Sequence, residues 1–336
     1  MRLTLLLTIP KNSKGLLSMF FSSGRISIYN WIVIILIFSL AIGSTLFLAA
    51  RYSTKVVQLA PITKRLTLGV HDPSGDFDKN SDIGLENYII RWDRLSEFDI
   101  AGELGKITAK KRIPMITIDP YPYNSSSIYI FNKIIEGQYD NEIKSICTSI
   151  SKIDQNVLVR WGRNMDFANI DVYPWANSDA FGFQSAYKYF VDTCRSIAAN
   201  TKYVWSPSGL TSFELFYPEA RYVDIIAFSI YSNQNQNENQ IMSGETGWPF
   251  EERLSFYYDY VKNYNKPIMI AEMGAAGRDD AKIVWVTNAL RRVLDKDVQR
   301  RLSYVVYDQN PINPPVSNYY KVAIDAYKIN PTIFKK

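Results

Sequence analysis

The stretch Pro267–Glu272 reads PIMIAE, and it decides the fold. Four apolar residues follow one another without polar alternation, and a carboxylate comes directly after them. A strand that is apolar at successive positions is buried on both faces, which is typical of a parallel sheet covered by helices. The stretch therefore predicts a central parallel strand with an acidic residue, Glu272, at its carboxyl end.

Similar runs recur along the chain, and segments of helical period, such as 183–199, 250–264 and 282–294, separate most of them. The other runs are Leu66–His71, Tyr88–Trp92, Pro114–Asp119, Val157–Arg163, Lys202–Ser206, Val223–Tyr231 and Leu302–Tyr307. Eight strands over about 265 residues predict an α/β fold, the closed (β/α)8 TIM barrel. A doubly wound open sheet is the alternative, but such sheets usually carry a Gly-rich first turn. The sequence has no G-x-G-x-x-G motif.

The charge of the chain is distributed unevenly. The 336 residues include 38 Lys and Arg against 33 Asp and Glu, a net charge of +5, and residues 1–51 hold five basic residues and no acid. The rest of the chain is therefore neutral overall. Since phosphate binding needs a basic face on the folded domain, we expect no nucleic-acid partner. A neutral domain suits a neutral substrate or a protein partner.

Residues 26–50 form an uncharged run of 25 residues between Arg25 and Arg51. About 20 apolar residues span a bilayer as a helix, so this run predicts a transmembrane anchor in the lipid bilayer. The basic residues before it predict a cytoplasmic tail at 1–25. A tether at 51–64 and an extracytoplasmic barrel at 65–336, periplasmic or extracellular, would follow. A cleaved signal peptide and a buried soluble helix are the alternatives.

The cysteines and the histidine limit other chemistry. One histidine and two cysteines cannot build a standard zinc site, so we expect neither a metal nor an organic cofactor. Cys147 and Cys194 fall in helical stretches on either side of the fourth strand. Because disulfide geometry is demanding, the sequence favours two separate buried thiols, with a disulfide as the alternative.

Polar residues gather where the expected strands end, which is where barrel enzymes place their catalytic groups. Glu272 is the most informative of them, because a carboxylate at the end of a buried strand is costly unless it is paired or used. It is either a catalytic group or a structural carboxylate bonded to a barrel arginine. Carboxylates near aromatic residues are typical of sugar chemistry.

A series of motifs extends from about Leu66 to Asp308. The motifs are EGQYD at 136–140, VLVRWGRNMD at 157–166, YPW at 173–175, YVWSPSG at 203–209, FYPEARYVDIIAFSIY at 216–231 and KPIMIAEMGAAG at 266–277. In order and spacing they resemble glycoside hydrolase family 26, which contains β-mannanases and some β-glucanases and β-xylanases. The resemblance implies a retaining barrel in which Glu272 is the nucleophile, Tyr231 orients it, and Arg160 is the arginine of the fourth strand.

One motif departs from the family. The family has His-Glu-Met after the fourth strand, whereas this chain has Arg163, Asn164 and Met165. The resemblance thus puts Asn164 where the acid/base glutamate belongs, and an amide cannot protonate a leaving group. Asp166 is the candidate substitute acid, because in an extended strand it points to the same side as Asn164.

Further residues are candidates for sugar binding. Trp92, Trp175 and Trp285 are expected either as sugar platforms or as ordinary core residues. His71 either lines the cleft or caps the first strand. The full set of expected substrate-binding residues is Arg160, Arg163, His71, Trp92, Asp119, Trp175, Trp285 and Asp308.

Two functions follow. The first is a membrane-anchored retaining hydrolase or transglycosylase that acts on a neutral β-linked polysaccharide of β-mannan or β-glucan type, with a role in exopolysaccharide biogenesis. The second is a catalytically impaired domain that binds a glycan or partners a membrane polysaccharide synthase.

Overall fold

The computed structural model describes residues 66–123, 130–167, 169–176, 178–209, 212–233, 250–276, 279–293, 301–309 and 328–329. All of them belong to the larger of two compact units, Pro61–Lys336. The expected tail, membrane helix and tether (residues 1–64) lie outside the described residues. Among the described helices, none has the length and apolar character needed to cross a membrane.

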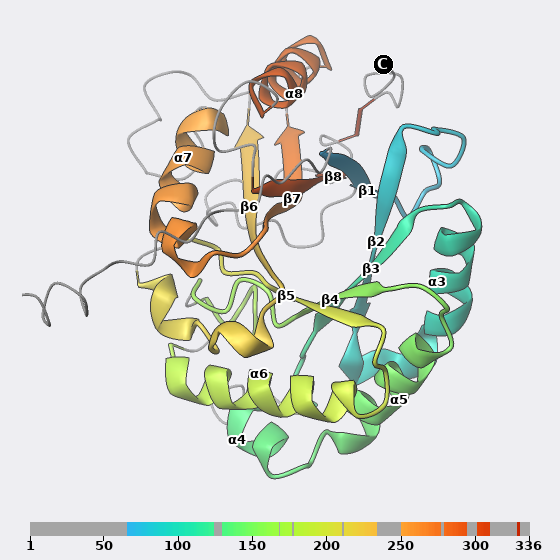
Figure 1. Ribbon diagram of the computed structural model, residues 1–336, viewed down its shortest axis with the longest axis vertical. Coiled ribbons are helices and arrows are strands. Elements are labelled where there is room, and N and C mark those ends of the chain that lie inside the picture. The colour runs from blue at the N-terminus through green and yellow to red at the C-terminus, as the bar shows by residue number, and fades with distance from the viewer. Residues whose placement is uncertain are drawn as a thin grey trace, which may run out of the picture. The chain divides into compact units, whose positions relative to one another are not determined.

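Eight parallel strands close into a barrel in the order of the sequence (Figure 1). They are β1 (Thr67–His71), β2 (Ile83–Arg91), β3 (Ile113–Asp119), β4 (Val157–Trp161), β5 (Thr201–Trp205), β6 (Ile225–Asn233), β7 (Ile268–Ala276) and β8 (Leu302–Asp308). The barrel closes because β1 pairs with β8, from Thr67 opposite Tyr304 to His71 opposite Asp308. The predicted (β/α)8 barrel is therefore confirmed, and the open sheet is excluded.

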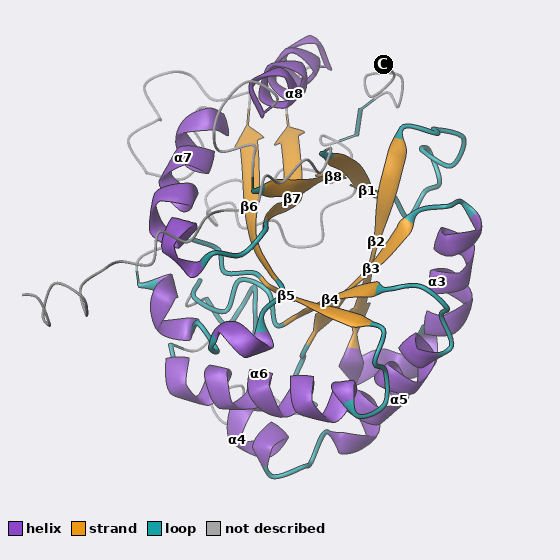
Figure 2. Ribbon diagram, viewed as in Figure 1, coloured by secondary structure: helices purple, strands orange, loops and turns teal. Residues whose placement is uncertain are grey.

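Helices surround the ring of strands (Figure 2). The α-helices are α3 (Ile100–Ala109), α4 (Ile130–Ile135), α5 (Asp140–Ser151), α6 (Ala180–Arg195), α7 (Phe250–Val261) and α8 (Asp279–Val293), and the short 3-10 helices are η1 (Trp92–Glu97), η3 (Phe213–Phe216), η4 (Ala220–Tyr222) and η6 (Lys262–Tyr264). Two of the helix starts are fixed by caps, because Asp99 and Asp179 accept from the backbone N–H groups of Gly102 and Gly182.

Two apolar clusters make the core. The larger one lies between strands and helices, which explains why successive strand positions are apolar. The smaller one is formed by the first halves of the strands and consists of Leu85, Met115, Leu158, Val204, Ile225, Ala227, Met269, Ala271, Tyr304 and Val306. Buried polar residues follow further along the same strands, among them Asp119, Arg160, Glu272 and Asp308. The strands thus change from apolar to polar toward their carboxyl ends.

Several strand boundaries differ from the prediction, and those of β4 and β7 matter most for the polar residues. β4 ends at Trp161, not Arg163, because Gly162 takes a left-handed φ of 63° that ends the extended run. β7 continues past Glu272 to Ala276, with irregular pairing to β8 between Ile270 and Met273. Glu272 therefore lies within a strand, beside a bulge, and not at the end of one.

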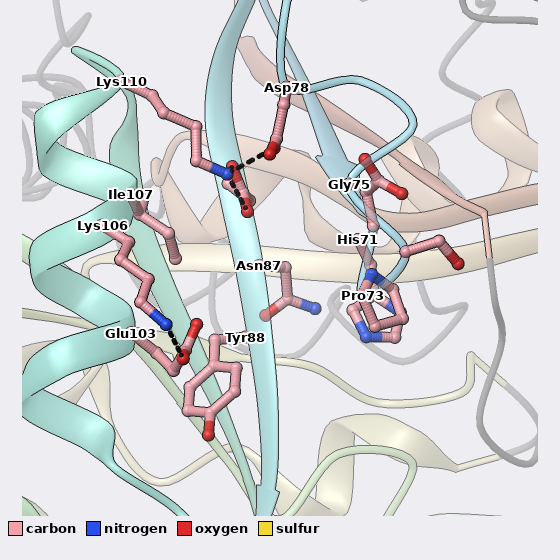
Figure 3. A pocket seen from close by; sticks show the side chains of 13 residues that line it. His71, Pro73, Gly75, Asp78, Asn87, Tyr88, Glu103, Lys106, Ile107 and Lys110 are labelled. Carbon is pink, nitrogen blue, oxygen red and sulfur yellow. Dashed lines mark hydrogen bonds and ion pairs between the residues drawn. The ribbon is translucent and has the colours of Figure 1, made fainter.

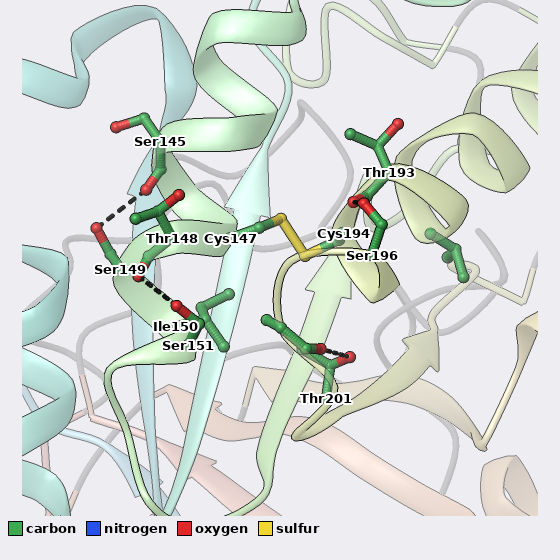
Figure 4. Close-up of a disulfide and its surroundings, with 12 residues drawn as sticks. Ser145, Cys147, Thr148, Ser149, Ile150, Ser151, Thr193, Cys194, Ser196 and Thr201 are labelled. Carbon is green, nitrogen blue, oxygen red and sulfur yellow. Dashed lines mark hydrogen bonds between the residues drawn. A yellow bond between two sulfur atoms is a disulfide. The ribbon is translucent and has the colours of Figure 1, made fainter.

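The expectation of two separate thiols is wrong. Cys147 of α5 and Cys194 of α6 form a disulfide, with their Cα atoms 5.3 Å apart (Figure 4). Both cysteines are on the buried faces of their helices, and these faces meet on the outside of the barrel. The Cα separation lies within the range that a disulfide requires, so the geometric objection to a disulfide does not apply.

Candidate active site

Glu272 is fully buried and receives hydrogen bonds at both carboxylate oxygens. Its Oε1 accepts from Nη1 of Arg160 and from Nη1 of Arg163, each at 2.5 Å. Its Oε2 accepts from the Oγ of Ser229 at 3.0 Å and from the hydroxyl of Tyr231 at 3.3 Å. Four donors on strands β4 and β6 and on the turn after β4 therefore hold the carboxylate in one orientation.

Two opposing effects act on the pKa of Glu272. Burial raises this pKa, because it disfavours the charged form, while the positive charges of Arg160 and Arg163 lower it. The arginines prevail, so the pKa of Glu272 is well below its ordinary value. The group is a carboxylate throughout the physiological pH range.

Arg163 bridges two carboxylates. Besides Glu272, it contacts Asp119 at the end of β3, with Nε 3.0 Å from Oδ1 and Nη2 3.1 Å from Oδ2. This two-pronged geometry is the strong form of an arginine–carboxylate pair. The Nε1 of Trp175 donates to the backbone carbonyl of Arg163 at 2.7 Å, so the turn that carries Arg163 is itself held in place.

A second chain of hydrogen bonds leads from Glu272 to the first strand. The Tyr231 hydroxyl lies 2.7 Å from Oδ2 of Asp308, and Oδ1 of Asp308 lies 2.8 Å from Nδ1 of His71. Burial, with the nearby Asp308 and Glu272 charges, raises the pKa of Tyr231 well above its ordinary value, so its hydroxyl stays protonated. Tyr231 therefore joins the carboxylates of Glu272 and Asp308 as a neutral group.

Asn164 is also fully buried, but it does not contact Glu272. Its Nδ2 donates to the hydroxyl of Tyr173 at 2.8 Å, and its backbone N–H donates to the carbonyl of Ser206 at 2.8 Å. Its Oδ1 has no hydrogen-bond partner among the described residues. The residue has a φ of 55°, a left-handed conformation that asparagine tolerates better than glutamate does.

The geometric argument for Asp166 as a substitute acid is wrong. Residues 162–167 form a turn and not an extended strand, so alternation does not align Asp166 with Asn164. The Asp166 carboxylate accepts from the N–H of Ser208 at 2.6 Å, from its Oγ at 2.8 Å and from the N–H of Gly209 at 3.1 Å. These bonds fix the loop after β5.

The tryptophans are packed and do not form an exposed sugar platform. Trp92 and Trp175 are fully buried, and the ring of Trp92 stacks on Tyr139 with 4.7 Å between centroids. Trp285 of α8 is half-buried and meets the ring of Phe250 edge-on. A sugar platform needs an accessible ring face, so the structure favours a core role for Trp92 and Trp175, and a helix-packing role for Trp285.

The structure joins most of the expected polar residues into one network. Its members are His71, Asp119, Arg160, Arg163, Tyr231, Glu272 and Asp308. Sequence reasoning missed Ser229 and Tyr173, although Ser229 lies two residues before Tyr231 on the same strand and Tyr173 begins the YPW motif. No cluster of three or more His, Cys, Asp or Glu suited to a metal ion occurs in the described parts of the chain.

Comparisons with known proteins now bear on this site. No family model matches the chain. Endoglucanase H of Acetivibrio thermocellus is 28% identical over 244 residues, which cover 66% of this chain and only 25% of that protein. The chain therefore spans about a quarter of the length of this curated relative.

Solved structures give the fold. The GH26 β-mannanase BoMan26A from Bacteroides ovatus has a TM-score of 0.56 at 14% identity, covering 79% of this chain and 87% of that one. The catalytic domain of the GH26 endo-β-1,4-mannanase of Bacillus sp. JAMB-750 has a TM-score of 0.57 at 15% identity, covering 82% and 86%. The chain shares the barrel fold of GH26 β-mannanases, and the resemblance to glycoside hydrolase family 26 is confirmed.

Proposed function

We propose that the barrel binds a neutral β-linked polysaccharide of the β-mannan or β-glucan type, and that its hydrolysis of natural polymers is lost or much reduced. The substrate class is supported by the relatives, which are named as β-mannanases and an endoglucanase. It is also supported by charge, because the chain beyond residue 51 carries equal numbers of acidic and basic residues. A glycan without charge is the polymer that such a domain accepts without electrostatic cost.

The observation that carries the impairment is the pair of arginines on Glu272. Both oxygens of this carboxylate already accept hydrogen bonds, and Oε1 lies 2.5 Å from two guanidinium groups. A carboxylate with a strongly lowered pKa is a weak nucleophile, and two guanidinium groups and the Ser229 hydroxyl already donate hydrogen bonds to its oxygens. Arg163 holds the Oε1 side, where the family has a histidine.

The missing acid supports the same conclusion. A retaining glycosidase places a second carboxyl about 5–5.5 Å from its nucleophile, to protonate the leaving oxygen and then to activate water. The groups that hydrogen-bond to the Glu272 carboxylate in the described structure are two arginines, a serine and a tyrosine. The carboxylates of Asp119 and Asp308 are bonded to Arg163 and to His71. Asn164 takes the acid/base position and has no proton to give.

A retaining hydrolase or transglycosylase is the second candidate, with Glu272 as nucleophile, Tyr231 orienting it and Arg160 beside it. The contacts of Tyr231 and Arg160 with Glu272 favour this candidate, because they are the contacts that the family resemblance implies. Asp166 could serve as the acid only after leaving Ser208 and Gly209.

The full-length chain separates the two candidates when it is kept in a detergent without a sugar headgroup. It would be incubated with 2,4-dinitrophenyl 2-deoxy-2-fluoro-β-mannoside and with the matching glucoside, and its intact mass measured, with Glu272→Gln as the control. Affinity electrophoresis in gels that contain mannan or β-glucan would measure polymer binding. Because dinitrophenolate leaves without an acid, a working nucleophile is labelled even without the acid/base group.

Retention by a polymer without hydrolysis supports the binding function. An adduct that Glu272→Gln abolishes, together with release of reducing ends at ordinary enzymatic rates, supports the hydrolase. Neither retention nor an adduct, in folded protein, contradicts both.

We further propose that residues 26–50 anchor the chain in a bilayer with the barrel outside the cytoplasm. A tether of this kind would hold the barrel beside a membrane polysaccharide synthase, where it could bind polymer as it emerges during exopolysaccharide biogenesis. The Cys147–Cys194 disulfide supports this location, since disulfides persist in oxidising compartments.

A further inference from the structure

A pocket of about 630 Å³ lies beside the first two strands, between the loop after β1, strand β2 and helix α3 (Figure 3). Its lining includes His71 at the end of β1, Asp72 of the loop that follows, Asn87 and Tyr88 of β2, and Lys106 of α3. The volume is in the range of sites that hold small molecules, about 300–1,000 Å³. None of the functions above uses this pocket.

The pocket exists because two neighbouring strands part. β1 and β2 are paired only as far as Val70 opposite Glu86, whereas β2 and β3 stay paired up to Arg91 opposite Asp119. The loop after β1 then turns away at Gly75, whose φ of 76° is one that glycine adopts without strain. Beyond Val70 and Glu86 the two strands no longer pair with each other, although β1 keeps β8 and β2 keeps β3 as a neighbour.

Two of the lining side chains hold an unused hydrogen-bonding atom. Asp72 and Asn87 are 5% and 3% exposed, and neither Oδ1 of Asp72 nor Nδ2 of Asn87 has a partner among the described residues. The other end of each is fixed: Oδ2 of Asp72 accepts from the N–H of Phe77 at 2.7 Å, and Oδ1 of Asn87 accepts from Oγ1 of Thr117 at 2.9 Å. An acceptor and a donor are therefore held in place, and leaving such buried atoms unpaired is costly.

The charges of the lining select against anions. Lys110 is paired with Asp78 and Glu86, and Lys106 is paired with Glu103. Asp72 adds a further carboxylate, so the acids outnumber the lysines and a phosphate or uronate would be repelled. A sugar hydroxyl both donates and accepts, so hydroxyls can satisfy Oδ1 of Asp72 and Nδ2 of Asn87 once a sugar displaces the side chains that cover these two buried atoms. The half-buried ring of Tyr88 offers an apolar surface for the sugar C–H groups.

The pocket is also linked to the candidate active site. His71 is part of its lining, and Nδ1 of His71 is bonded to Asp308, which is bonded through Tyr231 to Glu272. We infer that this pocket is a second carbohydrate site, which takes a neutral hexose unit and contacts the network of Glu272 through His71. The sugar class rests on the proposed function, while the pocket and its unpaired atoms do not.

The test measures binding of methyl β-mannopyranoside and methyl β-glucopyranoside to the full-length chain by isothermal titration, in a detergent without a sugar headgroup. Asp72→Asn keeps the acceptor for Phe77 and turns the unpaired acceptor into a donor. Asn87→Asp keeps the acceptor for Thr117 and removes the unpaired donor. Each is expected to weaken the affinity for at least one of the two sugars by about tenfold. Asp259→Asn, an exposed change of the same kind on α7, should leave it unchanged.

Tyr88→Leu removes the ring and leaves the hydrogen bonds of Asp72 and Asn87 in place, so it too should weaken binding if the other two variants fail to fold. The inference is overturned if the wild type binds neither sugar, or if folded Asp72→Asn, Asn87→Asp or Tyr88→Leu protein binds as the wild type does. Polymer retention, measured on the same samples, distinguishes a failure of the pocket inference from a failure of the proposed function. Retention with unchanged sugar affinity overturns the pocket alone. No retention, with affinity lost in the variants, contradicts the proposed function alone.

Discussion

At the scale of single residues, the donors around Glu272 determine what its carboxylate can do. A catalytic carboxylate is often held at a cost in stability, because activity needs a reactive group. Glu272 has the opposite surroundings, since it supplies counter-charge to two buried guanidinium groups, that of Arg160 and, together with Asp119, that of Arg163. Under the proposed function, Glu272 acts as an anchor for Arg160 and Arg163.

Glu272→Gln should consequently destabilise the protein. Removing one partner of a buried ion pair leaves an uncompensated charge and typically costs about 3–5 kcal/mol. Urea unfolding of the full chain would measure the loss, with the exposed Asp259→Asn as the control. An increase in the free energy of unfolding would instead identify Glu272 as a strained catalytic group.

The same ion pairs predict how stability depends on pH. The pKa of Glu272 is lowered in the folded state, so its stabilising contribution is complete above its unfolded pKa, near 4.5, and is lost as the pH falls below that value. We expect the free energy of unfolding to decrease by about 1.4 kcal/mol per pH unit from this group below about pH 4.5. Wild type and Glu272→Gln would be unfolded in urea at about pH 6 and about pH 3. Equal losses in the two proteins would contradict the prediction.

Restoring the family's residues after β4 should restore hydrolysis. Arg163→His with Asn164→Glu removes one of the two guanidinium groups from Oε1 of Glu272 and supplies a proton donor, which typically contributes about 10²–10⁴ in rate. Reducing ends released from mannan and β-glucan would measure the gain, and Arg163→His with Asn164→Gln is the matched control without an acid. The left-handed φ at residue 164 makes glutamate cost about 1–2 kcal/mol there, and Asp119 loses its partner, so folding must be verified. Equal rates for the two double variants would contradict the impairment mechanism.

The sequence identified most residues of this network and, through the resemblance, the contact of Tyr231 with Glu272, but not the contacts of Arg163. Glu272, Arg160 and Tyr231 could be predicted because each lies in a motif of the family. The contact between Arg163 and Glu272 could not, because the two are 109 residues apart and only the closed barrel brings them together. Asp166 was misplaced for a local reason: left-handed residues at Gly162 and Asn164 replace the extended strand that the alternation argument assumed.

At the scale of elements, apolar runs predicted all eight strands. β2 shows what such runs miss, because its first residues, Ile83 to Asn87, mix Gly, Glu and Asn with apolar residues and do not read as a buried strand. Part of this polarity serves the pocket, where Glu86 and Asn87 are lining residues. The pocket was therefore invisible to a search for hydrophobic periodicity.

The disulfide between α5 and α6 should add measurable stability. It joins residues 47 positions apart, and closing a loop of that size typically contributes about 2–4 kcal/mol. Cys147→Ala with Cys194→Ala should lower the free energy of unfolding by this amount, and reduction of the wild type should have the same effect. Ser145→Ala, an exposed change on α5, is the control. If reduction changes neither stability nor gel mobility, the disulfide is absent in solution.

At the scale of the whole molecule, charge is distributed unevenly between the N-terminal tail and the rest of the chain. Four basic residues and no acid precede residues 26–50, and the chain after residue 51 carries equal numbers of basic and acidic residues. Positive residues remain on the cytoplasmic side of a membrane segment, so the proposed anchor at 26–50 would orient the barrel outward. An outward-facing barrel and an intact disulfide are therefore predicted together, because only the outer side of the membrane is oxidising.

Expression in a bacterial host with an oxidising periplasm tests that prediction. Cys147 and Cys194 of the full chain should resist labelling by a maleimide–polyethylene glycol after denaturation without reductant, because they are joined as a disulfide. A chain without residues 1–50 stays in the reducing cytoplasm, so both of its cysteines should be labelled. Replacing Arg2, Lys11, Lys14 and Arg25 by Gln removes the charge that sets the orientation, so a labelled fraction should appear in the full chain. If the unaltered full chain is labelled as readily as the truncated one, its barrel faces the cytoplasm, and a role beside emerging polysaccharide is no longer tenable.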